Sequence, residues 1–156
     1  MKIVQQTELT NKQKEQVLEL WNKEYPKQLT YNSIVDFENY LNKLINPTHY
    51  LLLDENEKMN GWATSFTREN EKWFAIIISE KLHKKGFGTQ MLNELKNNEN
   101  ILNGWVTDHN SDKKLNGDFY QSPLEFYLKN DFEILSETRL ELNIMSAVKI
   151  KWTKTI

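Results

Sequence analysis

Residues 73–96 read WFAIIISEKLHKKGFGTQMLNELK, and this stretch decides the fold. Its first part, Trp73 to Ile78, is an unbroken apolar run rich in β-branched and aromatic residues, which predicts a strand buried on both faces. A turn follows, Lys84-Lys85-Gly86-Phe87-Gly88, and apolar residues then recur at helical spacing between Met91 and Leu95. The stretch therefore predicts a central strand, a glycine turn and a helix.

The glycine turn has the chemistry of an anion-binding site. The first N–H groups of a helix have no partner within the helix, and the aligned peptide dipoles leave partial positive charge there. Gly86 and Gly88 carry no Cβ, so a phosphate group can lie directly against the backbone amides. Lys84, Lys85 and His83 add positive charge beside it. A diphosphate is the expected ligand, although a plain strand-to-helix connection with solvated lysines has the same pattern.

Two common nucleotide-binding motifs do not fit this turn. A Rossmann fingerprint needs a third glycine and a Walker A loop needs Gly-Lys-Ser/Thr, and neither is present. The segment His83 to Gly88 instead resembles motif A of the GCN5-related N-acetyltransferase (GNAT) family, Gln/Arg-x-x-Gly-x-Gly/Ala, with His83 in place of Gln or Arg. In that family the backbone amides of the motif hold the pyrophosphate of acetyl-CoA.

The composition is that of an ordinary globular domain. The 156 residues are 38% hydrophobic and 12% aromatic, and 20 basic residues against 22 acidic ones give no basic field for nucleic acid or an anionic membrane. Cysteine is absent and the three histidines lack metal-ligand spacing, so we expect no disulfide, catalytic thiol or metal. No stretch has the length of a signal peptide core or a membrane span, which predicts a cytoplasmic protein.

Hydrophobic periodicity and turn residues predict the remaining elements. Helices are expected from Thr10 to just before Pro26, from about residue 32 to Ile45, and from Ser122 to about Asn130. Strands are expected over residues 1–6, 50–53, 61–67, 101–107, 132–142 (one strand or a bent one) and 148–152. The strand-helix-strand order over 73–107 predicts a parallel crossover. Residues 108–121 are polar and too long for an ordinary connection, which is typical of a functional or mobile loop.

This element order, β-α-α-β-β-β-α-β-α-β-β, resembles that of the GNAT family over essentially the whole chain. The segment Phe126 to Phe132 also resembles the family's Phe/Leu-Tyr-x-x-x-Gly-Phe pattern, with Tyr127 at the tyrosine and Asp131 at the glycine. The resemblance implies an α/β (α+β) GNAT-type acyl-CoA N-acyltransferase fold, with a mixed, mostly antiparallel twisted sheet of about seven strands flanked by four helices and a splayed parallel strand pair. Residues 1–156 are then expected to form a single GNAT-like acetyltransferase domain.

The resemblance also implies the site residues. The pantetheine of acetyl-CoA is expected on backbone groups around Ile76, Ile77, Ile78 and Ser79, and its pyrophosphate on His83, Lys84, Lys85, Gly86, Phe87, Gly88 and Thr89. Tyr127 is expected beside the cofactor as the acid that protonates the departing thiolate, and a core tyrosine is its alternative role. Asp108 and His109, where strand 101–107 ends, are candidate bases, and a solvated loop start is the alternative.

The leading hypothesis is an N-acetyltransferase that transfers the acetyl group of acetyl-CoA directly to a primary amine of a small molecule or peptide. The acceptor stays open among a polyamine, an amino sugar, an amino acid and a peptide terminus; side chains that can attract a cationic amine are Glu24, Tyr25, Asp36, Asp112 and Asp118. Because strand 73–78 lacks the glutamate that some family members place there, a noncatalytic acyl-CoA-binding or sensor module is the alternative. A nucleic-acid binder using Lys84, Lys85, Lys113 and Lys114 has the weakest support. Family members often form homodimers, which leaves a homodimer open.

Overall fold

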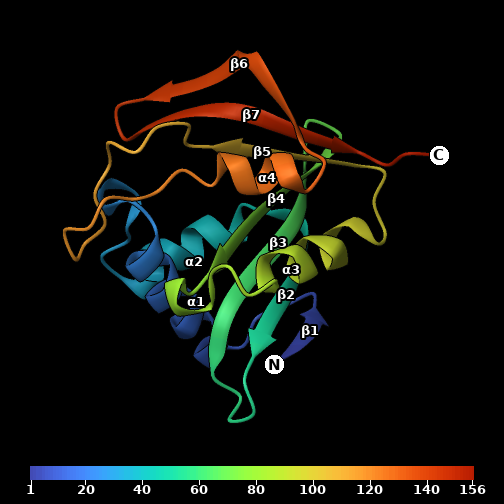
Figure 1. The fold of residues 1–156 in the computed structure, drawn as a ribbon. Helices are drawn as coiled ribbons and strands as arrows, with labels where there is room; N and C mark the ends of the chain where they lie inside the picture. Colours follow the sequence, from blue (N-terminus) through green and yellow to red (C-terminus); the bar gives the residue numbers. More distant parts are fainter.

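The computed structural model describes residues 1–156 and contains one seven-stranded sheet and four α-helices (Figure 1). The strands are β1 (Lys2–Gln6), β2 (Ile45–Leu53), β3 (Met59–Arg68), β4 (Glu71–Ile78), β5 (Ile101–Val106), β6 (Glu133–Leu142) and β7 (Met145–Thr153). The helices are α1 (Asn11–Glu24), α2 (Ile34–Asn42), α3 (Phe87–Lys96) and α4 (Leu124–Lys129). This is the element order that the sequence predicts.

The sheet is mixed and opens at its centre. Its strands lie in the order β1-β2-β3-β4-β5-β7-β6, and every neighbouring pair is antiparallel except β4 and β5. These two parallel strands share a single aligned pair, Trp73 with Asn103, and then separate toward their carboxyl ends. The predicted splayed parallel pair is therefore confirmed, and β4 is the central strand.

Two hydrophobic cores hold the helices against opposite faces of the sheet (Figure 1). Successive side chains of a strand point to opposite faces, so Phe74 of β4 packs with α3 and α4, while Ile77 packs with α1 and α2. Met91, Leu92 and Leu95 of α3 are fully buried, as their helical spacing predicts. The glycine turn before α3 is thereby fixed against the end of β4.

Helix α1 starts with a capping box. The Thr10 hydroxyl accepts a hydrogen bond from the Gln13 N–H at 3.1 Å, and the Gln13 side chain accepts one from the Thr10 N–H at 2.9 Å. Such a cap stabilises a helix by about 1 kcal/mol. α1 ends at Glu24, two residues before Pro26, which places Glu24 and Tyr25 beside the carboxyl end of β4.

The predicted end of the second helix at Ile45 is wrong. α2 ends at Asn42, and Ile45 begins β2, which is longer than the predicted strand 50–53. Asn46 has a left-handed backbone (φ 49°), and the β2–β3 register shifts between Ile45 and Thr48. β1 pairs with β2 only from His49 onward, so Pro47 lies in an irregular strand end where its missing N–H breaks no ladder with β1.

The carboxyl-terminal hairpin agrees with the sequence. β6 is continuous but bent, because its register with β7 shifts between Leu135 and Arg139. Asp131 has φ 70°, a left-handed backbone conformation that aspartate tolerates better than most residues. No helix is long and apolar enough to cross a membrane.

Candidate active site

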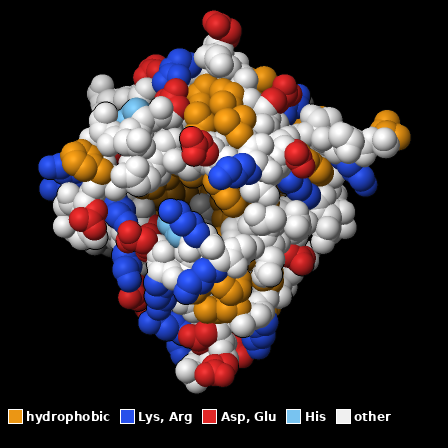
Figure 2. All heavy atoms as spheres, in the orientation of Figure 1, with side chains coloured by type: hydrophobic (Ala, Val, Ile, Leu, Met, Phe, Trp, Pro, Cys, Tyr) orange, Lys and Arg blue, Asp and Glu red, His pale blue; other side chains and the backbone are white.

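The gap between β4 and β5 exposes backbone groups of the central strand. The Ser79 N–H donates to the Asn60 carbonyl of β3 at 2.9 Å, so by alternation the backbone groups of Ile78 and Ile76 point toward β5. The β4–β5 ladder has already ended there, and both side chains are only half-buried. Figure 2 shows a hollow near the centre of this face, with hydrophobic side chains in its depth and basic side chains on its rim.

The glycine turn presents the amino terminus of α3 to this gap. Gly86 is the N-cap residue with φ 87°, no side chain caps the helix, and no atom lies within 4 Å of the position of a Gly86 Cβ. Lys84 is also left-handed, with φ 63°. The first N–H groups of α3 have no partner within the helix. The turn therefore has the left-handed glycine and the uncapped helix start on which the predicted anion site depends.

Gly88 lets α4 approach the turn closely. A Cβ on Gly88 would lie 2.8 Å from Cζ and 3.0 Å from Cε1 of Phe126, distances that require one of the two groups to move. Phe126 precedes Tyr127 in α4, and their rings pack edge to face at 5.2 Å. The first turn of α3 and the tyrosine are thus held in one packing unit.

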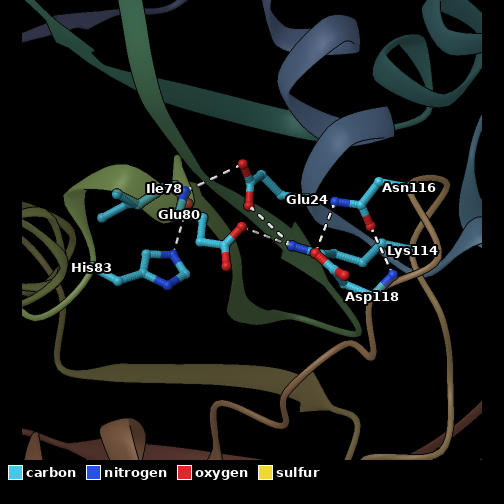
Figure 3. Close-up of polar contacts among 7 residues, drawn as sticks. All are labelled: Glu24, Ile78, Glu80, His83, Lys114, Asn116 and Asp118. Atoms are coloured by element: carbon cyan, nitrogen blue, oxygen red, sulfur yellow. Dashed lines mark hydrogen bonds and ion pairs between the residues drawn. The ribbon is translucent and has the colours of Figure 1, made fainter.

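His83, the residue that departs from the family motif, contacts the edge of β4 that borders the gap. Its Nε2 lies 2.9 Å from the backbone carbonyl oxygen of Ile78, as Figure 3 shows. This carbonyl belongs to the edge of β4 that the splay leaves unpaired. His83 therefore fixes the segment between β4 and the glycine turn onto the strand.

Tyr127 lies where the two sheet halves separate. Its ring packs against Phe74 and Phe132, the residue is only 6% exposed, and its hydroxyl forms no hydrogen bond with another protein group. Burial, followed by the neighbouring Tyr120, raises the pKa of Tyr127 well above 10, so the phenol is protonated at neutral pH. A protonated and unpaired hydroxyl can donate a proton to a group placed in the gap.

Tyr25 and Tyr120 lie next to Tyr127 on the side of α1. The rings of Tyr25 and Tyr120 are 6.4 Å apart, edge to face. Burial, then Asp112 and Glu24, raise the pKa of Tyr120 to about 12. Burial and then Tyr120 raise the pKa of Tyr25. Three protonated phenols, from the residue after α1, from the 108–121 segment and from α4, therefore lie near one another.

An ion cluster with two buried members, Glu24 and Lys114, adjoins these tyrosines (Figure 3). Lys114 is 8% exposed, and its Nζ lies 3.2 Å from Glu80 Oε2 and 4.0 Å from Glu24 Oε1. The other carboxylate oxygen of Glu24 accepts the Glu80 N–H at 3.2 Å. Sequence reasoning considered Glu24 only as one of several acidic side chains, named Lys114 only among the lysines of a nucleic-acid binder, and missed Glu80. Nothing in the polar 108–121 stretch marks Lys114 as buried.

Asp108 and His109 lie at the end of β5 but are already engaged. Arg139 of β6 binds both carboxylate oxygens of Asp108, at 2.8 and 3.1 Å, and these hydrogen bonds hold the pKa of Asp108 below its usual value. His109 Nδ1 accepts the Ser111 N–H at 3.2 Å, and its Nε2 lies 3.8 Å from Asp112. The bidentate partner Arg139 could not be predicted, since 31 residues separate it from Asp108.

No family profile and no curated protein sequence matches the chain. Solved structures do resemble it over nearly the whole length of both chains. An aminoglycoside 6'-N-acetyltransferase complexed with coenzyme A has a TM-score of 0.73 at 15% identity, covering 98% of this chain and 97% of that chain. A GNAT superfamily phosphinothricin acetyltransferase from Sinorhizobium meliloti in complex with AcCoA has a TM-score of 0.69 at 13% identity, covering 98% and 89%.

A variant of spermidine N-acetyltransferase SpeG from Vibrio cholerae resembles the chain with a TM-score of 0.66 at 16% identity, covering 98% of this chain and 95% of that chain. The chain therefore has the fold of the GNAT acetyltransferases, which confirms the fold that its sequence predicts. At these identities the likeness concerns the fold, so the chemistry has to be argued from the residues at the gap.

Proposed function

We propose that residues 1–156 act as an acetyl-CoA-dependent N-acetyltransferase that passes the acetyl group directly to a primary amine. The observation that carries this proposal is the alignment of two features: the open backbone edge of β4 and the uncapped amino terminus of α3. A strand edge binds an extended amide-containing chain, and a helix amino terminus binds phosphate. Acetyl-CoA combines these two parts in one molecule.

The cosubstrate would lie along β4 and across the turn. Backbone groups of the segment Ile76 to Ser79 would bind the pantetheine amides, with those of Ile76 and Ile78 facing it by alternation. The N–H groups of residues 86–89 would hold the pyrophosphate, and Lys84 and Lys85 would add charge beside it. His83 would keep the turn on β4 through the Ile78 carbonyl.

The reaction would need one new bond and one broken bond. The neutral amine nitrogen attacks the thioester carbonyl carbon, the carbon–nitrogen bond forms, and the carbon–sulfur bond breaks with its electron pair on sulfur. The Tyr127 hydroxyl would donate its proton to this thiolate, because it is buried, protonated and free of protein partners. The phenolate would then be reprotonated from the proton that the acceptor amine gives up.

His109 is a better candidate for accepting that proton than Asp108. The ion pair with Arg139 lowers the basicity of Asp108, since protonating the carboxylate would break two charge-assisted hydrogen bonds. His109 contacts only the Ser111 N–H and, at 3.8 Å, Asp112.

Calorimetry with acetyl-CoA, dephospho-CoA and ATP tests the cosubstrate. We expect micromolar binding of acetyl-CoA with a clear preference over ATP, followed by amine-dependent release of CoA in a panel of polyamines, amino sugars, amino acids and peptides. Absence of acetyl-CoA binding would refute the proposal. Binding without turnover of any amine would leave the noncatalytic acyl-CoA-binding module, which the absence of a carboxylate within Trp73 to Ile78 favours.

A further inference from the structure

The segment of residues 108–121, here called the acceptor loop, is firmly docked although it contains no helix or strand of the sheet. The Lys27 N–H donates to the Lys113 carbonyl at 2.8 Å, which joins the loop to the chain just after α1. Within the loop, the Lys114 N–H donates to the Asp118 carbonyl at 2.8 Å, around a turn where Gly117 has φ 90°. Backbone hydrogen bonds therefore hold the acceptor loop in a defined conformation against the segment after α1.

The ion cluster connects the acceptor loop to the end of β4, the strand proposed to bind the cosubstrate. Glu24 ends α1, Glu80 follows β4 by two residues, and Lys114 reaches both carboxylates from the acceptor loop (Figure 3). Glu24 also accepts the Glu80 N–H, so one carboxylate joins the three segments. Buried charges need such partners, because an unpaired charge loses its hydration without compensation.

We propose that Lys114 is a positioning residue for the acceptor. Its ion pairs with Glu24 and Glu80, here called the latch, hold the acceptor loop in place. The inference rests on the proposed function, because it places the acceptor against the acceptor loop. The latch keeps Tyr120 beside Tyr25, and the Tyr120 N–H donates to the Asp112 carbonyl at 2.8 Å within the same loop. Lys114 thereby sets the shape of the acceptor side without touching the reacting atoms.

The latch also has a consequence for recognition. The ammonium of Lys114 pairs with both Glu24 and Glu80, so the ammonium of an acceptor would have to compete with it for these carboxylates. The tyrosine hydroxyls and Asp112 are the remaining groups proposed to recognise the acceptor. Loss of the latch should therefore change acceptor binding and leave acetyl-CoA binding on β4 and the glycine turn nearly unchanged.

Lys114→Met tests the latch, and Lys113→Met is the matched control. Lys113 is the neighbouring lysine of the same loop, but it is exposed and its Nζ lies over the Phe119 ring at 5.3 Å. We expect Lys114→Met to speed amide hydrogen exchange in residues 108–121 selectively and to raise the KM for the amine by about tenfold to 100-fold, the range of a misplaced positioning group. The KM for acetyl-CoA should stay within about twofold of the wild-type value. Lys114→Arg should return hydrogen exchange and the KM for the amine toward wild-type values, because it retains the charge.

Glu80→Ala provides a second test if Lys114→Met fails to fold. Lys114→Met leaves the buried Glu24 carboxylate without its lysine, whereas Glu80→Ala keeps that pair. The variant removes only the 64% exposed Glu80 side chain and with it the shorter of the two Lys114 contacts. Faster exchange confined to the acceptor loop in either variant supports the latch. Unchanged exchange, or equal effects of Lys113→Met, overturns it. Hydrogen exchange needs no substrate, so the latch can stand even if no amine is acetylated, and that result would count against the proposed function alone.

Discussion

Gly88 lies against Cζ and Cε1 of the Phe126 ring, at a distance that leaves no room for a Cβ. The contact joins the first turn of α3 to α4, which carries Tyr127. The glycine proposed to open the turn to a phosphate therefore also sets the distance between that turn and the proposed acid. Under the proposed function, this packing contact would couple cosubstrate binding to the chemistry.

Gly88→Ala should weaken acetyl-CoA binding and reduce stability. The added methyl group must displace the Phe126 ring or the turn, and overpacking of this kind costs about 1–3 kcal/mol. Calorimetry with acetyl-CoA and urea unfolding measure the two effects. The double variant Gly88→Ala/Phe126→Leu should recover stability, because the smaller side chain makes room. An equally large loss in the double variant would show that the Phe126 contact is not the cause.

Gly86 tests the backbone conformation of the turn separately from packing. Gly86 has φ 87° and open space around its Cβ position, so Gly86→Ala adds no clash but places an L-residue in the left-handed region at about 1–2 kcal/mol. Asparagine tolerates this region better. We expect Gly86→Ala to bind acetyl-CoA about tenfold more weakly and Gly86→Asn to lie between it and the wild type. Equal affinity in all three proteins would argue that the left-handed turn is not needed for binding.

The sequence predicts the element order and the fold, apart from the boundary between α2 and β2, but it does not predict the contacts that join distant segments at the site. Local patterns such as the run Trp73 to Ile78 and the Thr10 capping box identify their elements, because neighbouring residues determine them. The α2 end was misplaced because Ile45 continues a helical stripe, whereas pairing with Thr67 of β3 makes it strand. Glu24, Glu80 and Lys114 come from three segments, and no spacing within one segment indicates that they meet.

Asp108 and His109 can be separated by mutation. We expect Asp108→Asn to lower kcat by less than about tenfold, because its carboxylate serves Arg139, and His109→Gln to lower kcat by about 100-fold, the loss typical of a general base. A larger loss of kcat in Asp108→Asn than in His109→Gln would reverse the assignment.

Tyr127→Phe should slow acetyl transfer and leave the fold intact. The hydroxyl forms no hydrogen bond with the protein, so its loss leaves no buried partner unsatisfied, and the ring contacts with Phe74 and Phe132 remain. We expect kcat to fall by about 100-fold with the KM for acetyl-CoA little changed, and the unfolding midpoint to stay near that of the wild type. Because the pKa of Tyr127 is raised well above 10, its ionisation should cause no loss of wild-type activity up to about pH 10. Near wild-type kcat in the variant would assign Tyr127 to the core alone.

His49 makes stability depend on pH away from the gap. Trp62 Nε1–H donates to His49 Nδ1 at 3.1 Å, and burial lowers the pKa of His49, which is 5% exposed, to about 4. The unfolded chain takes up this proton near pH 6.5 and the folded protein only near pH 4, so the stabilisation is full above 6.5 and is lost as the pH falls toward 4. The shift corresponds to about 3 kcal/mol between these limits.

Urea unfolding at pH 7.5, 5.5 and 4.5 measures this loss as the difference between the wild type and His49→Gln, whose amide oxygen can still accept the Trp62 N–H. We expect the wild type to lose more free energy of unfolding than the variant as the pH falls, while His83→Gln, which alters an exposed ring, should follow the wild type. Parallel pH profiles for the wild type and His49→Gln would mean that the folded protein accepts a proton at His49 as readily as the unfolded chain does. In that case the Trp62 contact would not hold the imidazole neutral.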